Sequence, residues 1–81
     1  ADAEVTLECR NGLAGVVIDR FGHDVWMCPH GEDYFRTRVV VSVSPQFFGW
    51  LTGIGSGIRI VGPEEVRQQY KEYLQDVIQN Y

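Results

Sequence analysis

The sequence predicts an α+β fold, a ferredoxin-like βαββαβ sandwich with an additional C-terminal α-helix. Apolar and polar residues alternate over 4–10 and over 34–43, as in half-buried strands. Apolar residues recur at every third or fourth position over 13–21 and 63–81, as in amphipathic helices. With right-handed crossovers, the element order βαββαβ gives this sandwich, in which helices cover only one face of the sheet.

The first half of the chain predicts a helix between two strands. Strand 4–10 is followed by Asn11, a competent N-cap, and then by a helix over 13–21. A short strand over 24–28 ends at Pro29, and the missing N–H of proline suits the edge of a sheet.

The second half adds strands over 34–43 and 58–61. The helix between them begins at Ser44-Pro45, because serine caps a helix and proline fits its first position. The last helix is expected to have Pro63 at its first position, with acidic residues in the first turn, and to run to the terminus.

Strand parity predicts which side chains the helices leave uncovered. The expected strand order is 4-1-3-2, and the outward set consists of Thr6, Glu8, Trp26, Cys28, Arg36, Arg38, Val40 and Arg59. A tryptophan beside arginines suits an anionic or planar ligand or a partner protein, so Trp26, Arg36, Arg38 and Arg59 form the candidate binding surface. Alternatively, the terminal helix or a neighbouring domain covers Trp26.

The same parity directs Cys9 toward the helices and Cys28 toward the open face. The first and second strands are not neighbours in this order, so both thiols are expected to be free. The terminal helix has more apolar surface than one neighbour can cover. Its residues Tyr73, Ile78 and Tyr81 are therefore the candidate interface with another subunit or domain.

Composition excludes several classes of function. Eleven acidic against seven basic residues give a net charge of −4, which opposes general nucleic-acid binding. No apolar run is long enough to span a bilayer, so no membrane partner is expected. The chain is expected to form one domain over 1–81 and, because it begins at Ala1, to be a fragment of a longer protein.

The chain is not expected to be an enzyme, and no cofactor or metal is expected. Cys28, His30 and His23 lack further ligands to complete a zinc site. No nucleophile has a recognisable base and orienting group. An acylphosphatase-like hydrolase shares the fold and uses an arginine in the loop after the first strand, where Arg10-Asn11-Gly12 lies, but that family's loop is longer and richer in glycine.

A single-stranded nucleic-acid-binding module resembling an RNA-recognition motif is the other alternative, since it has the same order of elements. That family has a basic-Gly-aromatic-Gly-aromatic run on its third strand. The stretch 34–41 lacks those glycines and an outward aromatic pair, so single-stranded binding would rest on Trp26 and the arginines.

A series of landmarks over most of the chain resembles the WCX module, the C-terminal extension that follows the WYL domain in bacterial helix-turn-helix transcriptional regulators. They are Asp19-Arg20-Phe21-Gly22; Val25, Met27 and Pro29; Ser44-Pro45, Phe47, Trp50-Leu51 and Gly55; Ile58-Arg59-Ile60; and Pro63-Glu64-Glu65-Val66 with Tyr70, Leu74 and Val77.

The resemblance implies a non-catalytic regulatory domain of a cytoplasmic, homodimeric transcription regulator. Such a domain would contribute to sensing a small-molecule or nucleotide effector or to dimerisation. It would contact the upstream WYL domain, and DNA would be bound only by the missing N-terminal helix-turn-helix domain. The landmarks are core, cap and turn positions, so the resemblance does not indicate which residues would bind a ligand.

Overall fold

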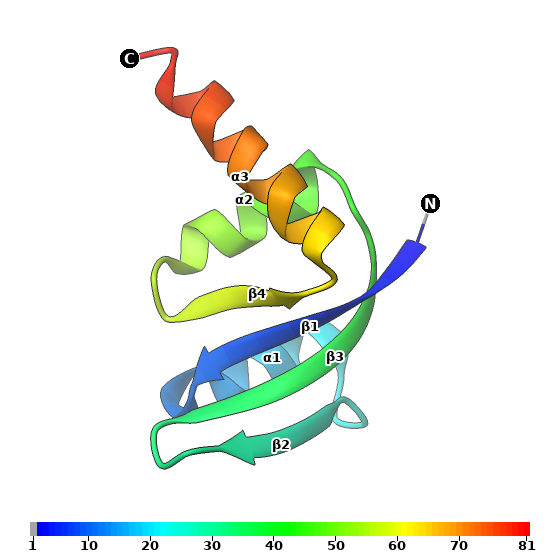
Figure 1. The fold of residues 1–81 in the computed structure, drawn as a ribbon. Helices are drawn as coiled ribbons and strands as arrows, with labels where there is room; N and C mark the ends of the chain where they lie inside the picture. The colour runs from blue at the N-terminus through cyan, green and yellow to red at the C-terminus, as the bar shows by residue number, and fades with distance from the viewer. Residues whose placement is uncertain (1) are drawn as a thin grey trace.

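The computed structural model describes residues 2–81 as an antiparallel sheet with helices (Figure 1). The strands are β1 (Asp2–Arg10), β2 (Trp26–His30), β3 (Tyr34–Ser42) and β4 (Ile58–Gly62). The helices are α1 (Ala14–Phe21), α2 (Pro45–Ile54) and α3 (Glu64–Ile78), with a short 3₁₀ turn, η1, over Asn11–Leu13. The strand order β2-β3-β1-β4 is the predicted one, and the α+β ferredoxin-like fold with a C-terminal helix is confirmed.

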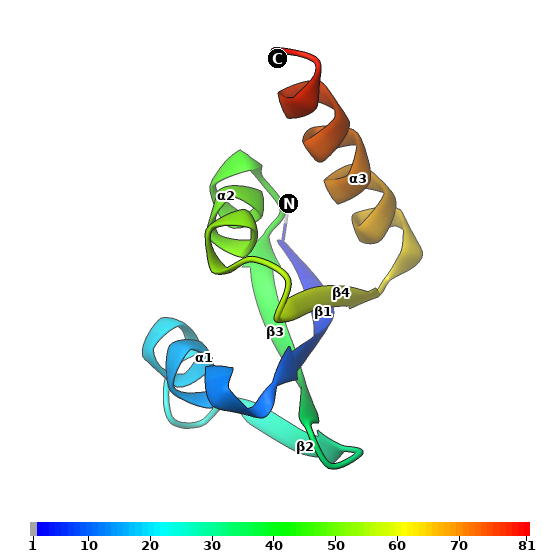
Figure 2. The same cartoon turned by 90° about the vertical axis from the view of Figure 1, so that its left-hand side faces the viewer.

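Helices α1 and α2 lie on the same face of the sheet, and the opposite face carries no helix over its central strands (Figure 2). The covered face holds the core, because alternate residues of each strand point toward the helices. The buried apolar residues are Val5, Leu7, Cys9, Val17, Phe35, Val39, Val41, Phe47, Phe48, Leu51, Ile58, Ile60 and Val66. The strand residues in this set agree with the predicted parity.

Helix starts differ in how well local sequence predicted them. Ser44 accepts a hydrogen bond from the Phe47 amide, as expected of an N-cap, and Pro45 opens α2. The prediction that Asn11 caps α1 is wrong. Its side chain donates instead to the carbonyl of Glu32 at 2.8 Å, because η1 separates Asn11 from the start of α1 and brings it next to the β2–β3 turn.

Three further boundaries are corrected. Strand β2 runs from Trp26 to His30 and includes Pro29, rather than covering 24–28. The ring is tolerated because β2 is an edge strand, paired only with β3. Pro63 precedes α3 as its N-cap in an extended conformation, with φ −72° and ψ 162°, so it is not the first helical residue. Helix α3 ends at Ile78, not at the terminus.

The first half of α3 docks on its own domain through aromatic side chains. Val66 is buried, and Tyr70 and Tyr73 contact Phe48 of α2 with ring centroids 5.2 and 5.5 Å apart. The Tyr70 hydroxyl also lies 2.9 Å from the hydroxyl of Thr52. The second half of the helix projects away from the sheet (Figure 1).

Candidate functional site

One row of side chains crosses all four strands on the open face. Cys28 of β2 pairs with Arg36 of β3, Arg36 with Glu8 of β1, and Glu8 with Arg59 of β4. Paired residues in neighbouring strands project to the same face at about 5 Å spacing. The register therefore holds an acid on the central strand between two arginines on its two neighbours.

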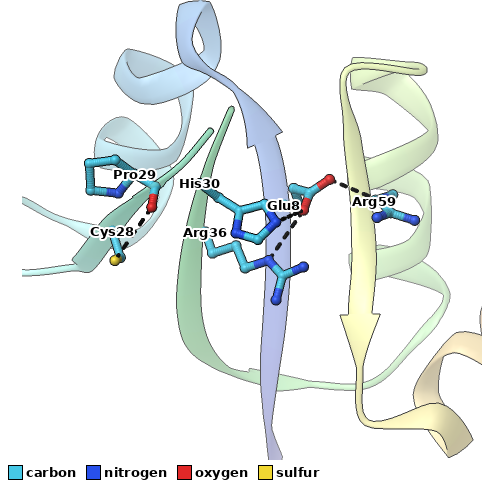
Figure 3. A network of polar contacts seen from close by, with 6 residues as sticks. All are labelled: Glu8, Cys28, Pro29, His30, Arg36 and Arg59. Carbon is cyan, nitrogen blue, oxygen red and sulfur yellow. Dashed lines mark hydrogen bonds and ion pairs between the residues drawn. The ribbon is translucent and has the colours of Figure 1, made fainter. Parts of the chain in front are cut away.

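Glu8 is the centre of a charged cluster (Figure 3). Arg36 Nε donates to Oε1 and Arg59 Nε donates to Oε2, each at 3.2 Å. His30, at the end of β2, brings Nε2 to 3.5 Å from Oε1. Glu8 is only 9 % exposed, although it lies on the uncovered face, because the arginine side chains lie over it.

Two opposing effects act on the pKa of Glu8. Burial raises it, because a charged carboxylate loses hydration. The hydrogen bonds from Arg36 and Arg59, together with their positive charges, lower it. The second effect is larger, so the pKa lies below its ordinary value of 4.5 and Glu8 is a carboxylate at neutral pH.

The arginines use only their Nε atoms to hold Glu8. Within residues 2–81, no hydrogen bond joins the terminal nitrogens of Arg36 or Arg59 to another group. The Arg59 side chain is 64 % exposed and that of Arg36 34 % exposed. The Nε contacts with Glu8 thus hold both guanidinium groups in place. Their terminal nitrogens still face solvent and can donate to an oxyanion.

A second group on the open face consists of Trp26 and Arg38. The Arg38 guanidinium lies over the Trp26 ring, 4.2 Å from its centroid, and the Thr37 hydroxyl donates to the Trp26 carbonyl at 2.6 Å. Trp26 remains 44 % exposed and neighbouring Val40 66 % exposed. The terminal helix does not cover Trp26, since α3 packs beside β4, at the other edge of the sheet (Figure 2).

The four predicted surface residues therefore form two groups. Arg36 and Arg59 belong to the Glu8 cluster. Arg38, two residues after Arg36 on β3, instead lies over the Trp26 ring. Sequence reasoning placed Glu8 on the open face but gave it no role, and it considered His30 only as a candidate zinc ligand. The predicted strand order places β3 and β4 on either side of the strand that carries Glu8, but both arginine contacts also depend on the register, which the structure shows.

The predicted interface residues of α3 also differ in their surroundings. Tyr73 is partly buried against Phe48 and Tyr70. Ile78 is 68 % exposed and Tyr81 is fully exposed, and Val77 beside them is 40 % exposed.

The two cysteines are free, and they lie where parity placed them. Cys9 is buried under the helices and Cys28 is exposed on the open face. Burial raises the pKa of the Cys9 thiol to about 11, with a further contribution from the negative charge of Glu8. Across residues 2–81, histidine, cysteine and acidic side chains nowhere gather in a group of three that would hold a metal ion. None of the helices described is long and apolar enough to span a membrane.

The sheet with one helical layer, and the charged cluster on its uncovered face, define a small α+β module of the ferredoxin-like class. The family model of the WCX domain matches residues 1–78, so the chain belongs to the WCX family. WCX domains are the C-terminal regulatory modules of regulators that contain a WYL domain. No curated protein and no solved structure matches the chain.

Proposed function

We propose that this WCX domain receives the regulatory signal of a transcription regulator on its open sheet face. One observation supports the proposal most strongly. Glu8, Arg36 and Arg59 form an organised ionic cluster on the uncovered face, with arginine donors left free. The cluster lies outside the apolar core, whose strand residues point to the other face. Arginines held this way are typical of anion recognition rather than of solvated surface.

The proposal includes the setting in which the domain works. The regulator would be cytoplasmic and would carry a WYL domain and a helix-turn-helix domain, the latter being the part that binds DNA. This domain has a net charge of −4, which is unfavourable for contact with the phosphate backbone. A signal molecule bound on the open face would act by changing how this domain contacts the WYL domain or a second subunit.

The test uses the intact regulator and a transcription reporter that it controls. Replacing Arg36 and Arg59 with alanine should reduce the response to the inducing condition at least tenfold, since each arginine supplies a charge-assisted contact. Arg20→Ala is the matched control, because Arg20 is an exposed arginine of α1 whose guanidinium lies over the Phe21 and Trp50 rings and not beside Glu8. An unchanged response in the double variant, with the protein folded, would rule out the open face as the receiving surface.

A second role in self-association is favoured by the exposed end of α3. Val77, Ile78 and Tyr81 present apolar surface that no other described residue covers. Tyr73 contacts Phe48 within the domain, so a partner would be met by the last turn of the helix rather than by Tyr73. Exposed apolar groups at a helix end commonly mark a contact with another chain.

Sedimentation of the 81-residue chain and of the Ile78→Glu variant tests this role. A dimer is expected for the unchanged chain, and Ile78→Glu should make it monomeric without changing its melting temperature at dilute concentration. Glu72→Gln, a change at an exposed position nearly two turns earlier, is the control. Two results together would contradict a role for this helix end. The 81-residue chain and both variants would all be monomers, and the intact regulator would still dimerise after removal of residues 76–81.

A further inference from the structure

A surface hollow of about 310 Å³ adjoins the Glu8 cluster. Its lining comes from β1, the start of β3, the turn between α2 and β4 and the start of β4. It consists of Glu8, Tyr34, Ser56, Gly57, Ile58 and Arg59. Two of these residues, Glu8 and Arg59, belong to the ionic cluster. The hollow thus begins where the free donors of Arg59 face solvent.

A third arginine reaches the same place from the end of β1. The Arg10 guanidinium lies 5.3 Å from the centroid of the Tyr34 ring. The Arg10 amide also donates to the Gly57 carbonyl at 2.8 Å, which fastens the α2–β4 turn beside it. Tyr34 and Gly57 both line the hollow, so Arg10 lies at its rim.

The turn that forms the far wall packs closely against Leu13. A Cβ on Gly57 would lie 3.0 Å from Leu13 Cδ1, so a side chain there would require Leu13 to shift by a few tenths of an ångström. Ser56, next to it, contributes a hydroxyl that can donate to a ligand. The wall is therefore held close to Arg10 and carries a polar group.

The net charge around the hollow is opposite in sign to the net charge of the whole chain. Arg10, Arg36 and Arg59 contribute three positive charges against the one negative charge of Glu8, which leaves two positive charges in a protein of net charge −4. His30 lies on the same cluster. Glu32 and Asp33, in the adjacent β2–β3 turn, form no ion pair with any arginine in residues 2–81.

We propose that this hollow is a binding site for a phosphate group, held by Arg59, Arg36 and Arg10 with the Ser56 hydroxyl. This assignment rests on the proposed function, since it names the chemical class of the effector. A phosphate monoester carries about −1.5 to −2 charges at pH 7, which matches the excess of two positive charges, whereas a carboxylate carries only one. Guanidinium groups also offer paired donors that fit the oxygens of phosphate. Glu8 acts as the positioning residue that orients two of the three arginines.

Titration of the 81-residue chain with inorganic phosphate, glycerol 2-phosphate and acetate, at constant ionic strength, tests the site. Backbone amide NMR shifts locate binding, and both phosphates should shift the amides of Ser56, Gly57 and Arg59. Phosphate should bind at least tenfold more tightly than acetate. Tighter binding of the glycerol ester than of inorganic phosphate would assign the site to esters; the reverse would assign it to the free ion.

Single substitutions of arginines inside and outside the hollow test which of them hold the phosphate. Arg59→Ala should weaken phosphate binding about tenfold, because it removes a charge-assisted contact. Arg59→Lys should recover part of that loss, since it keeps the charge without the paired donors. Arg38→Ala and Arg20→Ala remove equal charges outside the hollow and should leave binding within twofold. Equal affinity for acetate, or equal losses in Arg20→Ala and Arg59→Ala, would overturn the site.

The two proposals fail in different ways. If phosphate does not bind but the Arg36 and Arg59 variants still alter the regulator's response, the ligand class is wrong and the proposed function stands. If phosphate binds as expected but the response is unaffected by those variants, the site exists and the proposed function is wrong.

Discussion

The two faces of the sheet are made by the same four strands and differ in what holds their side chains. On the covered face, alternate residues such as Val5, Leu7 and Val39 pack against α1 and α2 and are almost completely buried. On the open face, the residues between them include Glu8 and Arg36, which form an ion pair, and Arg38, which lies over the Trp26 ring. One face is stabilised by removal of apolar area from water, and the other by directional contacts between ions.

Tolerance to substitution should therefore alternate from one residue to the next along each strand. Core positions respond to any change in volume or polarity. Open-face positions respond only where a side chain holds a partner, as Glu8 does, and not where it is solvated, as Val40 is. Four experiments test this contrast between the two faces.

Thiol reactivity should show the largest difference between the faces. Cys28 is exposed, whereas Cys9 is fully buried and its pKa is raised to about 11. A thiol reagent at pH 8 should modify Cys28 at least about a thousandfold faster than Cys9, because Cys9 reacts only when the domain opens. Two thiols should titrate after unfolding without reductant. Comparable rates in the folded chain would mean that Cys9 does not lie beneath the helices.

Two neighbouring valines of β3 provide a matched pair. Val39 is 5 % exposed on the covered face and Val40 is 66 % exposed on the open face. Val39→Thr places a hydroxyl in an apolar site and should lower the free energy of unfolding by roughly 1–3 kcal/mol. Val40→Thr, the same chemical change, should stay within about 0.5 kcal/mol. Urea unfolding measures both, and equal losses would show that a second element covers the open face.

The pH dependence of stability should report Glu8. Its pKa is lower in the folded chain than the ordinary 4.5, so the unfolded chain takes up this proton first as the pH falls. The carboxylate therefore stabilises the fold fully above pH 4.5. That contribution is lost as the pH drops toward the folded pKa.

Glu8→Gln isolates this contribution from the other acids. The variant keeps the shape but cannot ionise, so it should be less stable than the parent by roughly 1 kcal/mol or less at pH 7. The difference between the two should shrink in acid. Since His30 also lies near Glu8, His30→Gln is the second control. A difference that stays constant from pH 7 to pH 3 would show that the charge of Glu8 does not contribute.

The smallest effect should distinguish the two arginines of β3. Arg38 lies over the Trp26 ring and pairs with no acid in residues 2–81, so Arg38→Ala should change stability by about 0.5 kcal/mol or less. Arg36→Ala should destabilise more, because it leaves the buried Glu8 with one arginine fewer. Thermal unfolding of both variants measures the order, and Trp26 fluorescence should change in Arg38→Ala alone. A reversed order would assign the structural contact to Arg38.

The sequence by itself determined the fold class, the strand order and the two faces of the sheet. These follow from periodicity, since every second residue of a strand shares a face and a buried face must be apolar. The landmarks that resemble the WCX module are of the same kind, and the match to that family agrees with them. Both cysteines could be placed in this way, and so could the capping serine of α2, because a cap depends on residues adjacent in the chain.

Only the tertiary structure decided which open-face residues act together. Glu8, Arg36 and Arg59 come from three strands, and their contacts depend on a register that a one-residue slip would abolish. Asn11 was assigned to the wrong partner for a related reason, since its hydrogen bond reaches a turn 21 residues away. The hollow beside Tyr34 and Ser56 lies where the end of β1 is hydrogen-bonded to the α2–β4 turn, which is distant in sequence. Periodicity reports the environment of one residue at a time, whereas a site requires the relative positions of several.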